Sequence, residues 1–206
     1  MLIMSSSDTN IMMHHPVLIA ITGGIGSGKS VVSTILKVAG YGVYDCDQRA
    51  KMLMNSDPHI KEALTGSFSS EIYRNGTLNR PMLSDIIFND KESLHLVNSI
   101  VHPVVRDDIM KWASQQSIVP AFIETAILKE GGLDTMVHEV WNVTAPIETR
   151  IERVIKRNNI SRDKVIERIN NQRELGDCNG KRVVSIVNDN TTPLLPQVVE
   201  AISKFL

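Results

Sequence analysis

The chain has 206 residues, which suits one α/β domain with an appended part rather than several independent domains. Its 22 Lys and Arg nearly balance its 23 Asp and Glu, and aromatic residues make up 4% of the sequence, so a dedicated nucleic-acid-binding or membrane-surface protein is disfavoured. The two cysteines, Cys46 and Cys178, form neither a metal-type spacing nor a disulfide framework, so we expect reduced thiols and a cytoplasmic protein.

The N-terminal segment, residues 1–15, is polar and rich in methionine. It lacks the basic start and apolar centre of a signal peptide, and we expect a disordered extension here. Its His14 and His15 are better explained by a solvated tail than by a metal site. No apolar stretch in the chain approaches the about 20 residues of a membrane span, so we expect no membrane partner.

Residues 23–30 read Gly-Gly-Ile-Gly-Ser-Gly-Lys-Ser, which fits the phosphate-binding pattern G-x-x-x-x-G-K-[ST]. Glycines let the backbone wrap closely, so that several N–H groups converge on the phosphates of a nucleotide. Lys29 places a positive charge on the β- and γ-phosphate oxygens, and Ser30 supplies a hydroxyl to Mg²⁺. This motif predicts a nucleoside triphosphate site.

The flanking residues support the motif. An unbroken apolar run over residues 17–21 predicts a buried parallel strand before the loop. Apolar residues at helical spacing follow it, and Gly40 is placed to end that helix. These apolar residues are Val31, Val32, Ile35, Leu36 and Ala39. A chance glycine-rich turn is disfavoured because strand, loop and helix occur in the required order.

A second strand is predicted over residues 42–45, and it runs into Asp45-Cys46-Asp47. Ligands bind at the carboxyl ends of strands in open parallel sheets. If the chain stays extended, Asp45 and Asp47 present both carboxylates on one side, and one could accept the proton of a substrate hydroxyl. The alternative is an N-cap or turn pair for the following helix, and the spacing leaves both interpretations open.

Helical patterns dominate from there to about residue 117. Pro81 can open one helix, and a second is predicted over residues 91–116, with Pro103 as a kink or restart. No strand is predicted in this stretch. Residues 50–116 are therefore expected to form a helical subdomain that binds the acceptor.

The rest of the chain alternates strands with helices. A third strand, residues 118–124, ends at Glu124, which could hold Mg²⁺ or face solvent. The remaining strands are expected over residues 138–143 and 182–187, with helices after Pro146, after the N-cap Ser161, and over residues 193–206. This alternation predicts a three-layer α/β/α sandwich of the P-loop type with a parallel five-stranded sheet. We expect a single domain over residues 16–206, its core made of residues 16–49, 117–147 and 177–206.

Arginines gather between the last two strands. Arg150, Arg153 and Arg157 fall at i, i+3 and i+7, so they share one helix face. Any one of them could lie on a solvated surface, but the cluster favours a helical lid over ATP at about residues 148–176, because the planar guanidinium matches phosphate oxygens.

Taken together, these motifs resemble the dephospho-CoA kinase family from about Leu18 to the C-terminus. The similar segments are Ile21 to Ser30, Asp45-Cys46-Asp47, Gly76 to Arg80, Val101-His102-Pro103, Glu124 to Glu130, and the lid residues Arg153, Arg157 and Gln172. The chain departs from the family pattern at Val31, Glu124, Ala126, Ile127 and Val184-Ser185.

The resemblance implies ATP-dependent phosphorylation of the ribose 3′-hydroxyl of dephospho-CoA, the last step of coenzyme A biosynthesis. It implies that Asp47 is the general base and that Lys29 and Arg153 are also catalytic. Implied ATP-binding residues are Gly24, Ile25, Gly26, Ser27, Gly28, Lys29, Ser30, Val31, Arg157 and Asn190. Arg80 and His102 would join Asp47 at the acceptor, and Ser30 and Glu124 would hold Mg²⁺. We expect dephospho-CoA and ATP as the partners, no nucleic acid, and a monomer or small homo-oligomer.

Two other function classes compete with this interpretation. A nucleoside monophosphate kinase-like enzyme would share the loop and lid but lack the pattern from Gly76 to Pro103. A nucleotide-dependent switch of the GTPase type needs an Asn-Lys-x-Asp guanine reader, which the sequence lacks. Residues 177–180 fit Asp-x-x-Gly but come too late in the chain to lie beside the γ-phosphate.

Overall fold

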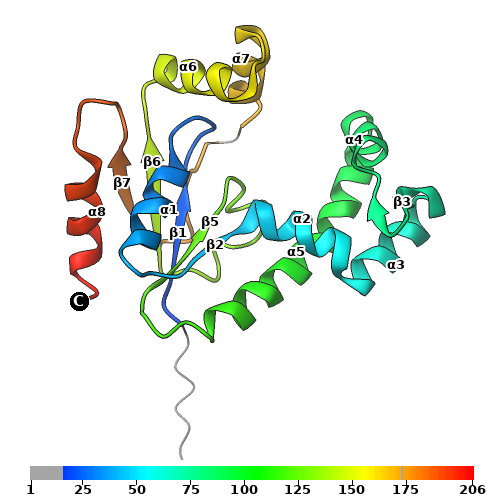
Figure 1. The fold of residues 1–206 in the computed structure, drawn as a ribbon, viewed down its shortest axis with the longest axis horizontal. Helices are drawn as coiled ribbons and strands as arrows, with labels where there is room; N and C mark the ends of the chain where they lie inside the picture. The colour runs from blue at the N-terminus through cyan, green and yellow to red at the C-terminus, as the bar shows by residue number, and fades with distance from the viewer. Residues whose placement is uncertain (1–15, 173) are drawn as a thin grey trace, which may run out of the picture.

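The structure is a computed structural model and describes residues 16–172 and 174–206 (Figure 1). The expected extension over residues 1–15, with His14 and His15, lies outside the described residues. A five-stranded sheet has the order β2-β5-β1-β6-β7, and every neighbouring pair is parallel. The strands are β1 (Leu18–Thr22), β2 (Val43–Asp45), β5 (Ala121–Glu124), β6 (Glu139–Thr144) and β7 (Arg182–Val187). The predicted parallel five-stranded sheet is confirmed.

Strand β1 lies at the centre because it is apolar on both faces. All five of its residues are buried. Leu18 and Ala20 belong to the core on one face of the sheet, whereas Ile19 and Ile21 belong to the core on the other. A strand with no polar side must be covered twice, which is the sequence signature of a parallel sheet between helices.

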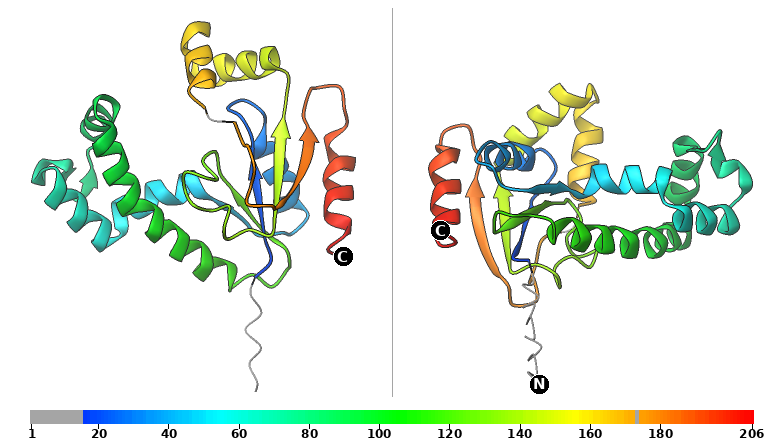
Figure 2. Two further views of the ribbon diagram at one scale, coloured as in Figure 1. Left: turned by 180° about the vertical axis from the view of Figure 1, so that it is seen from behind. Right: turned by 60° about the horizontal axis from the view of Figure 1, so that its bottom comes forward.

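Helices cover the sheet on both faces (Figure 2). Helices α1 (Lys29–Val38) and α8 (Leu194–Ser203) pack on one face through residues such as Leu36 and Val198. Helix α5 (Lys91–Ala113) packs on the other face through residues such as Val105 and Ile109. The predicted three-layer α/β/α sandwich is confirmed.

A mainly helical part extends away from one edge of the sheet (Figure 1). It contains α2 (Cys46–Ser56), α3 (Pro58–Ser67), α4 (Arg80–Asn89) and one end of α5. It also contains a hairpin of β3 (Tyr73–Arg74) and β4 (Thr77–Leu78), where no strand was predicted. Each of these strands has two residues, too few to show an alternating pattern, and Asn75 and Gly76 turn between them with positive φ.

Two prolines shift the predicted boundaries in this region. Pro103 lies inside α5, which runs on as one helix, so the predicted restart is wrong. The third strand begins at Ala121 rather than at residue 118, because Pro120, which follows a cis peptide bond, offers no N–H to a neighbouring strand. Pro81 lies in the first turn of α4, as predicted.

The predicted elements of the C-terminal part are confirmed. Helix α6 (Ile147–Asn158) follows Pro146 and ends at Asn159 in the left-handed conformation. Helix α7 (Arg162–Asn170) follows Ser161, although that side chain makes no capping hydrogen bond. Strand β7 has the predicted bounds. Among the described residues, no helix combines the length and apolar character needed to cross a membrane.

Candidate active site

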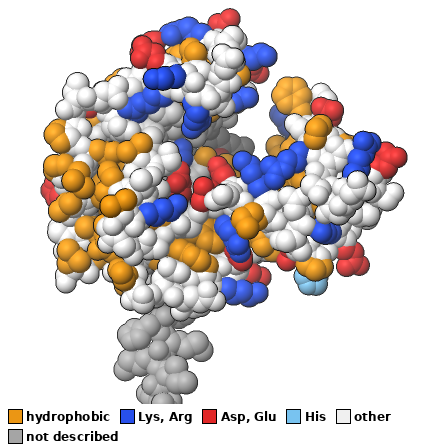
Figure 3. Space-filling view, viewed as in Figure 1, with side chains coloured by type: hydrophobic (Ala, Val, Ile, Leu, Met, Phe, Trp, Pro, Cys, Tyr) orange, Lys and Arg blue, Asp and Glu red, His pale blue; other side chains and the backbone are white. Residues whose placement is uncertain are grey.

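A cavity of about 310 Å³ opens at the carboxyl ends of β1, β2 and β5, where ligands bind in parallel α/β sheets. Its walls come from the phosphate-binding loop (residues 23–30), the start of α2 and the end of β5. Lining residues are Lys29, Asp45, Asp47, Gln48, Lys51, Glu124, Thr125 and Ala126. Figure 3 shows basic and acidic side chains side by side at the hollow between the sheet and the helical part.

The phosphate-binding loop adopts a conformation that favours glycine. Gly26 and Gly28 have φ values of 79° and 94°, in the left-handed region. The Ser27 N–H donates to the Gly24 carbonyl at 3.0 Å, and α1 begins directly after Gly28. The first turn of α1 contains no acidic residue, so the positive end of its dipole is available to an anion.

Gly26→Ala should lower ATP affinity about tenfold or more. A Cβ at this position would lie 2.5 Å from the Arg150 carbonyl oxygen, and a positive φ costs roughly 1–2 kcal/mol for a residue with a side chain. The loop would have to shift, and its amides would no longer converge. Calorimetric titration with ATP measures the loss. Gly66→Ala on α3 is the control, since a Cβ there meets no atom within 4 Å. Unchanged affinity in Gly26→Ala would contradict the assigned loop geometry.

Lys29 joins the loop to the cavity. Its ammonium donates to the Gly23 carbonyl at 2.9 Å and to the Gly24 carbonyl at 3.4 Å. Burial lowers the pKa of Lys29, while the charges of Glu124 and Asp47 oppose that shift. Lys29, Asp47 and Glu124 line the same cavity, where the loop meets the ends of β2 and β5.

The two aspartates at the end of β2 and the start of α2 have different positions. Helix α2 begins at Cys46, so the chain does not stay extended through Asp47, and the first of the two alternatives is excluded. The Asp45 side chain accepts from the Gln48 N–H at 2.9 Å and caps α2, which matches the N-cap alternative. Asp47 lies in the first helical turn. Both carboxylates still line the cavity.

Asp47 has the electrostatic character expected of a base. Burial around the carboxylate raises the pKa of Asp47 and the Asp45 charge raises it further, whereas Lys29 and Lys51 oppose the shift. A raised pKa increases the proton affinity of the carboxylate. Cys46, between the two acids, has its thiol pKa raised by burial and by their charges, which disfavours the thiolate form.

Glu124 lies next to the aspartates across the sheet. In the register of β5 it pairs with Asp45 of β2 and Ile21 of β1. The Glu124 and Asp47 carboxylates line the cavity, and Ser30 follows Lys29 in the first turn of α1. All three are hard oxygen donors, the type that Mg²⁺ prefers. Over residues 16–172 and 174–206, no group of three or more His, Cys, Asp or Glu could hold a metal by itself. A magnesium ion here would also need phosphate or water oxygens.

Two arginines of α6 contact the phosphate-binding loop. Arg150 donates through Nε to the Ile25 carbonyl at 2.9 Å. Arg153 donates to the carbonyls of Gly26 and Ser27, both at 3.3 Å. Arg153 also contacts Asn188 and Asn190 on the loop after β7. The predicted shared face is therefore confirmed for Arg150 and Arg153, and it faces the loop.

Arg157, the third member of that row, donates to Asn158 at 2.8 Å instead of contacting the loop. Its charge and that of Arg150 nevertheless contribute to the lowered pKa of Lys29. Asn190 adopts a left-handed conformation and accepts from Arg153.

Two amide side chains that were absent from the predicted site complete this contact. The Ile25 N–H donates to Gln172 Oε1 at 2.7 Å. Asn188 Nδ2 donates to the Ser27 carbonyl at 2.9 Å. The family pattern pointed to Gln172, but only as part of the lid, and no local signal marked Asn188. The loop is thus held from outside by the segments that follow β6 and β7.

Arg80 and His102, which were predicted to join Asp47 at the acceptor, are not among the residues that line the cavity. Arg80, at the start of α4, donates to the Lys51 carbonyl at 3.5 Å. His102, on α5, lies beside Glu130, and burial and the Arg106 charge lower the pKa of the imidazole. Each therefore contacts a segment that also contributes lining residues: α2 for Arg80 and the loop after β5 for His102.

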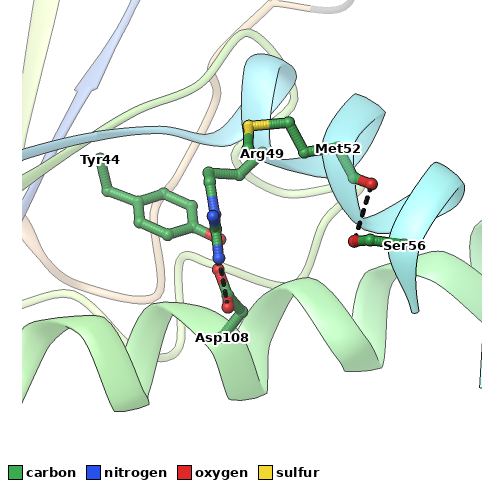
Figure 4. A network of polar contacts seen from close by, with 5 residues as sticks. All are labelled: Tyr44, Arg49, Met52, Ser56 and Asp108. Carbon is green, nitrogen blue, oxygen red and sulfur yellow. Dashed lines mark hydrogen bonds and ion pairs between the residues drawn. The ribbon is translucent and has the colours of Figure 1, made fainter. Parts of the chain in front are cut away.

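A polar network that was not predicted fixes α2 against α5 (Figure 4). Asp108 accepts from Arg49 Nε at 2.9 Å, from Arg49 Nη2 at 2.7 Å and from the Tyr44 hydroxyl at 2.5 Å. Burial alone would raise the pKa of Asp108, but the bonds to Arg49 and Tyr44 outweigh it and lower the pKa. Because Tyr44 precedes Asp47 and Arg49 follows it, the network orients the start of α2.

Asp108→Ala should destabilise the protein by about 1–2 kcal/mol, because the buried Tyr44 hydroxyl loses its acceptor, whereas Arg49 loses its partner but remains partly open to water. Urea unfolding of the variant measures this change. Asp107→Ala, at the neighbouring exposed position of α5, is the control and should change the unfolding free energy little. Equal stability of the two variants would show that the network contributes nothing to the fold.

Comparisons with known proteins agree on one family. A family model described as dephospho-CoA kinase matches residues 17–193. A dephospho-CoA kinase from Porphyromonas gingivalis is 40% identical over 187 residues, covering 90% of this chain and 93% of its own. One from Bacteroides fragilis is 37% identical over 186 residues, covering 90% and 91%.

Solved structures share the same fold. A crystal structure of a Thermus thermophilus protein superposes with a TM-score of 0.81 at 32% identity, covering 93% of this chain and 98% of that one. A dephospho-CoA kinase from Campylobacter jejuni has a TM-score of 0.66 at 21% identity, covering 91% and 96%. At that identity the second structure supports the fold alone.

Proposed function

The chain belongs to the dephospho-CoA kinase family and is an ATP-dependent kinase, and we propose that it phosphorylates the ribose 3′-hydroxyl of dephospho-CoA with Asp47 as the general base. The products are CoA and ADP. One observation carries the assignment of roles: Asp47 lines the same cavity as Lys29 of the phosphate-binding loop. A base and a phosphate-binding cation on one cavity wall are what phosphoryl transfer to an alcohol requires.

The transfer follows from these positions. The loop amides and Lys29 hold the β- and γ-phosphates of ATP at the start of α1. The Asp47 carboxylate accepts the proton of the 3′-hydroxyl as that oxygen attacks the γ-phosphorus. The bond from the γ-phosphorus to the bridging oxygen breaks, and ADP leaves. The protein forms no covalent bond to the substrates in this step, so positioning and electrostatic stabilisation provide most of the rate acceleration.

The remaining ATP-binding residues support this step. Gly24, Ile25, Ser27 and Val31 belong to the loop or the first turn after it. Arg153 stabilises the loop conformation through its hydrogen bonds to the loop carbonyls and places a positive charge on the lid. Arg157 adds a second positive charge in the last turn of α6. Asn190, bonded to Arg153, is proposed to lie near the adenine. Ser30 and Glu124 would hold Mg²⁺, which neutralises phosphate charge when bound.

The acceptor is proposed to bind between the cavity and the helical subdomain of residues 50–116. Arg80 and His102 are its proposed contacts, supported by their positions against α2 and against the loop after β5. Residues 148–176 are proposed as the lid. The monomeric or small homo-oligomeric state, the cytoplasmic location and the absence of nucleic-acid and membrane partners stay predictions.

The pH dependence of kcat tests the base directly. Asp47 must be ionised to accept a proton, so kcat should fall as pH drops through the pKa of Asp47, which lies above the ordinary aspartate value of 3.8. Asp45→Asn should move this acidic limb to lower pH, because the Asp45 charge is one cause of the raised pKa, and Asn retains the helix cap. An acidic limb at the same pH in both proteins would contradict the assignment.

An acceptor panel tests the function itself. ADP release is measured with dephospho-CoA, AMP, UMP and GMP at equal concentrations. The proposal predicts the highest kcat/KM with dephospho-CoA and a product whose mass is that of CoA. A preference for a nucleoside monophosphate would favour the competing kinase class, and ADP release without any phosphorylated acceptor would point to an ATPase or a switch.

A further inference from the structure

Lys51 lies on the cavity wall but has no part in the reaction described above. We propose that its ammonium binds the diphosphate of dephospho-CoA, between the adenosine and the pantetheine arm. This inference rests on the proposed function, since it concerns the same acceptor. Lys51 is then a binding residue that favours an acceptor with a 5′-diphosphate.

Helix geometry places Lys51 at the appropriate distance from the base. Asp47 and Lys51 are four residues apart on α2, so they share one helix face and lie about 6 Å apart along its axis. Both line the cavity, and α2 leads from the sheet edge into the helical part (Figure 1). In dephospho-CoA the 5′-phosphate lies across the ribose from the 3′-hydroxyl. A ribose with its 3′-oxygen at Asp47 therefore brings the diphosphate toward the next turn of α2.

The negative charges on the cavity wall would oppose binding of the acceptor unless a cation lies near the Lys51 turn of α2. Asp45, Asp47 and Glu124 give the cavity three carboxylates, which repel an acceptor carrying a negatively charged diphosphate. Lys29 and Lys51 are the two basic lining residues. Lys29 already donates to the loop carbonyls and serves the phosphates of ATP. Lys51 is left to compensate the charge of the second substrate.

The contacts of Lys51 leave its ammonium available. The residue is exposed, and none of the ion pairs among the described residues includes it. Its backbone carbonyl accepts from Asn55 Nδ2 at 2.9 Å and from Arg80 Nη2 at 3.5 Å. The second contact places the Arg80 guanidinium beside the same turn of α2. Two cations therefore gather where the diphosphate is expected.

Lys51 could instead act only on the charge of Asp47, whose pKa its ammonium helps to lower. The two roles predict different kinetics. Loss of a diphosphate contact weakens binding of dephospho-CoA and raises its KM. Loss of a charge next to Asp47 moves the acidic limb of the kcat profile to higher pH and leaves that KM unchanged.

The test is steady-state kinetics of Lys51→Met, which keeps most of the side-chain length, with Lys51→Arg and the control Lys91→Met at the start of α5. The KM for dephospho-CoA should rise about tenfold or more in Lys51→Met, while the KM for ATP stays within about twofold. Lys51→Arg should stay near wild type, because arginine also binds phosphate. Raising the salt concentration should increase the KM for dephospho-CoA less in Lys51→Met than in wild type.

An unchanged KM for dephospho-CoA in Lys51→Met would overturn the proposal, with or without a shift of the acidic limb. An equal rise in Lys91→Met would also overturn it, since a general loss of positive charge would then explain the effect. If Lys51→Met folds poorly by circular dichroism, Lys51→Gln takes its place with the same expected rise. A wild-type protein that transfers nothing to dephospho-CoA would instead refute the proposed function, which this comparison separates from the role of Lys51.

Discussion

Asp47→Asn is expected to lower kcat by about two orders of magnitude or more, because general-base catalysis contributes roughly 10²–10⁴ in rate. Asparagine has nearly the shape of aspartate but cannot accept the proton of the ribose hydroxyl. Affinity for ATP should be retained, since the loop amides and Lys29 are unchanged. Steady-state kinetics with saturating dephospho-CoA measures kcat, and calorimetric titration measures ATP affinity.

A control variant and the stability of Asp47→Asn itself separate this effect from misfolding. Asp45→Asn removes a neighbouring charge but retains the cap of α2, so it should keep most of the activity at neutral pH. The raised pKa of Asp47 means that the folded protein binds this proton more tightly than the unfolded chain does. That contribution to stability is present at low pH and is lost as pH rises through the folded-state pKa. Asp47→Asn should therefore be at least as stable as wild type at neutral pH. A kcat equal to that of wild type would show that Asp47 is not the general base.

Lys29→Met is expected to lower kcat/KM for ATP by about 10²–10³ or more, which is the range for removing one group that stabilises developing charge. Its ammonium donates to the loop carbonyls and lines the same cavity as the carboxylates of Asp47 and Glu124. Without it, phosphate oxygens would face those carboxylates with no intervening cation. The measurement is ADP release over a range of ATP concentrations, together with ATP titration.

Lys37→Met, in the last turn of the same helix and exposed, is the matched control and should leave kcat/KM within about twofold. Lys29→Arg keeps the charge but not the compact ammonium, so it should recover only part of the activity. Lys29 also bonds the Gly23 carbonyl, and thermal unfolding of each variant reports whether the loop itself has loosened. Wild-type kinetics in Lys29→Met would refute the assigned role of the loop.

The local features of the fold could be predicted because they depend on neighbours in sequence. The apolar run of β1, the glycines of the loop and the row of arginines on α6 each carry a short-range pattern. The sequence left open whether the chain stays extended through Asp47, because a carboxylate at the end of a strand can also cap a helix. The hydrogen bond from the Gln48 N–H to Asp45 shows that it caps α2. The β3–β4 hairpin was missed because two-residue strands have no period.

The contacts that fix the site could not be predicted in the same way. Arg49 and Asp108 are 59 positions apart, and Ile25 and Gln172 are 147 apart. Residue types alone do not indicate such partners, because many other carboxylates and amides in the chain would serve equally well. Lys51 lacked even a local motif, and its position on the cavity wall became visible only once α2 was placed.

The central claim is that the γ-phosphoryl group of ATP passes to the 3′-oxygen of a ribose held at Asp47. A single turnover with labelled ATP tests it most directly, with enzyme in excess over dephospho-CoA and the product examined by phosphorus NMR. We predict that the label appears as a 3′-phosphomonoester of CoA, and that Asp47→Asn forms the same ester at least about 100-fold more slowly. Label in inorganic phosphate or at another position, or an equal rate in the variant, would contradict it.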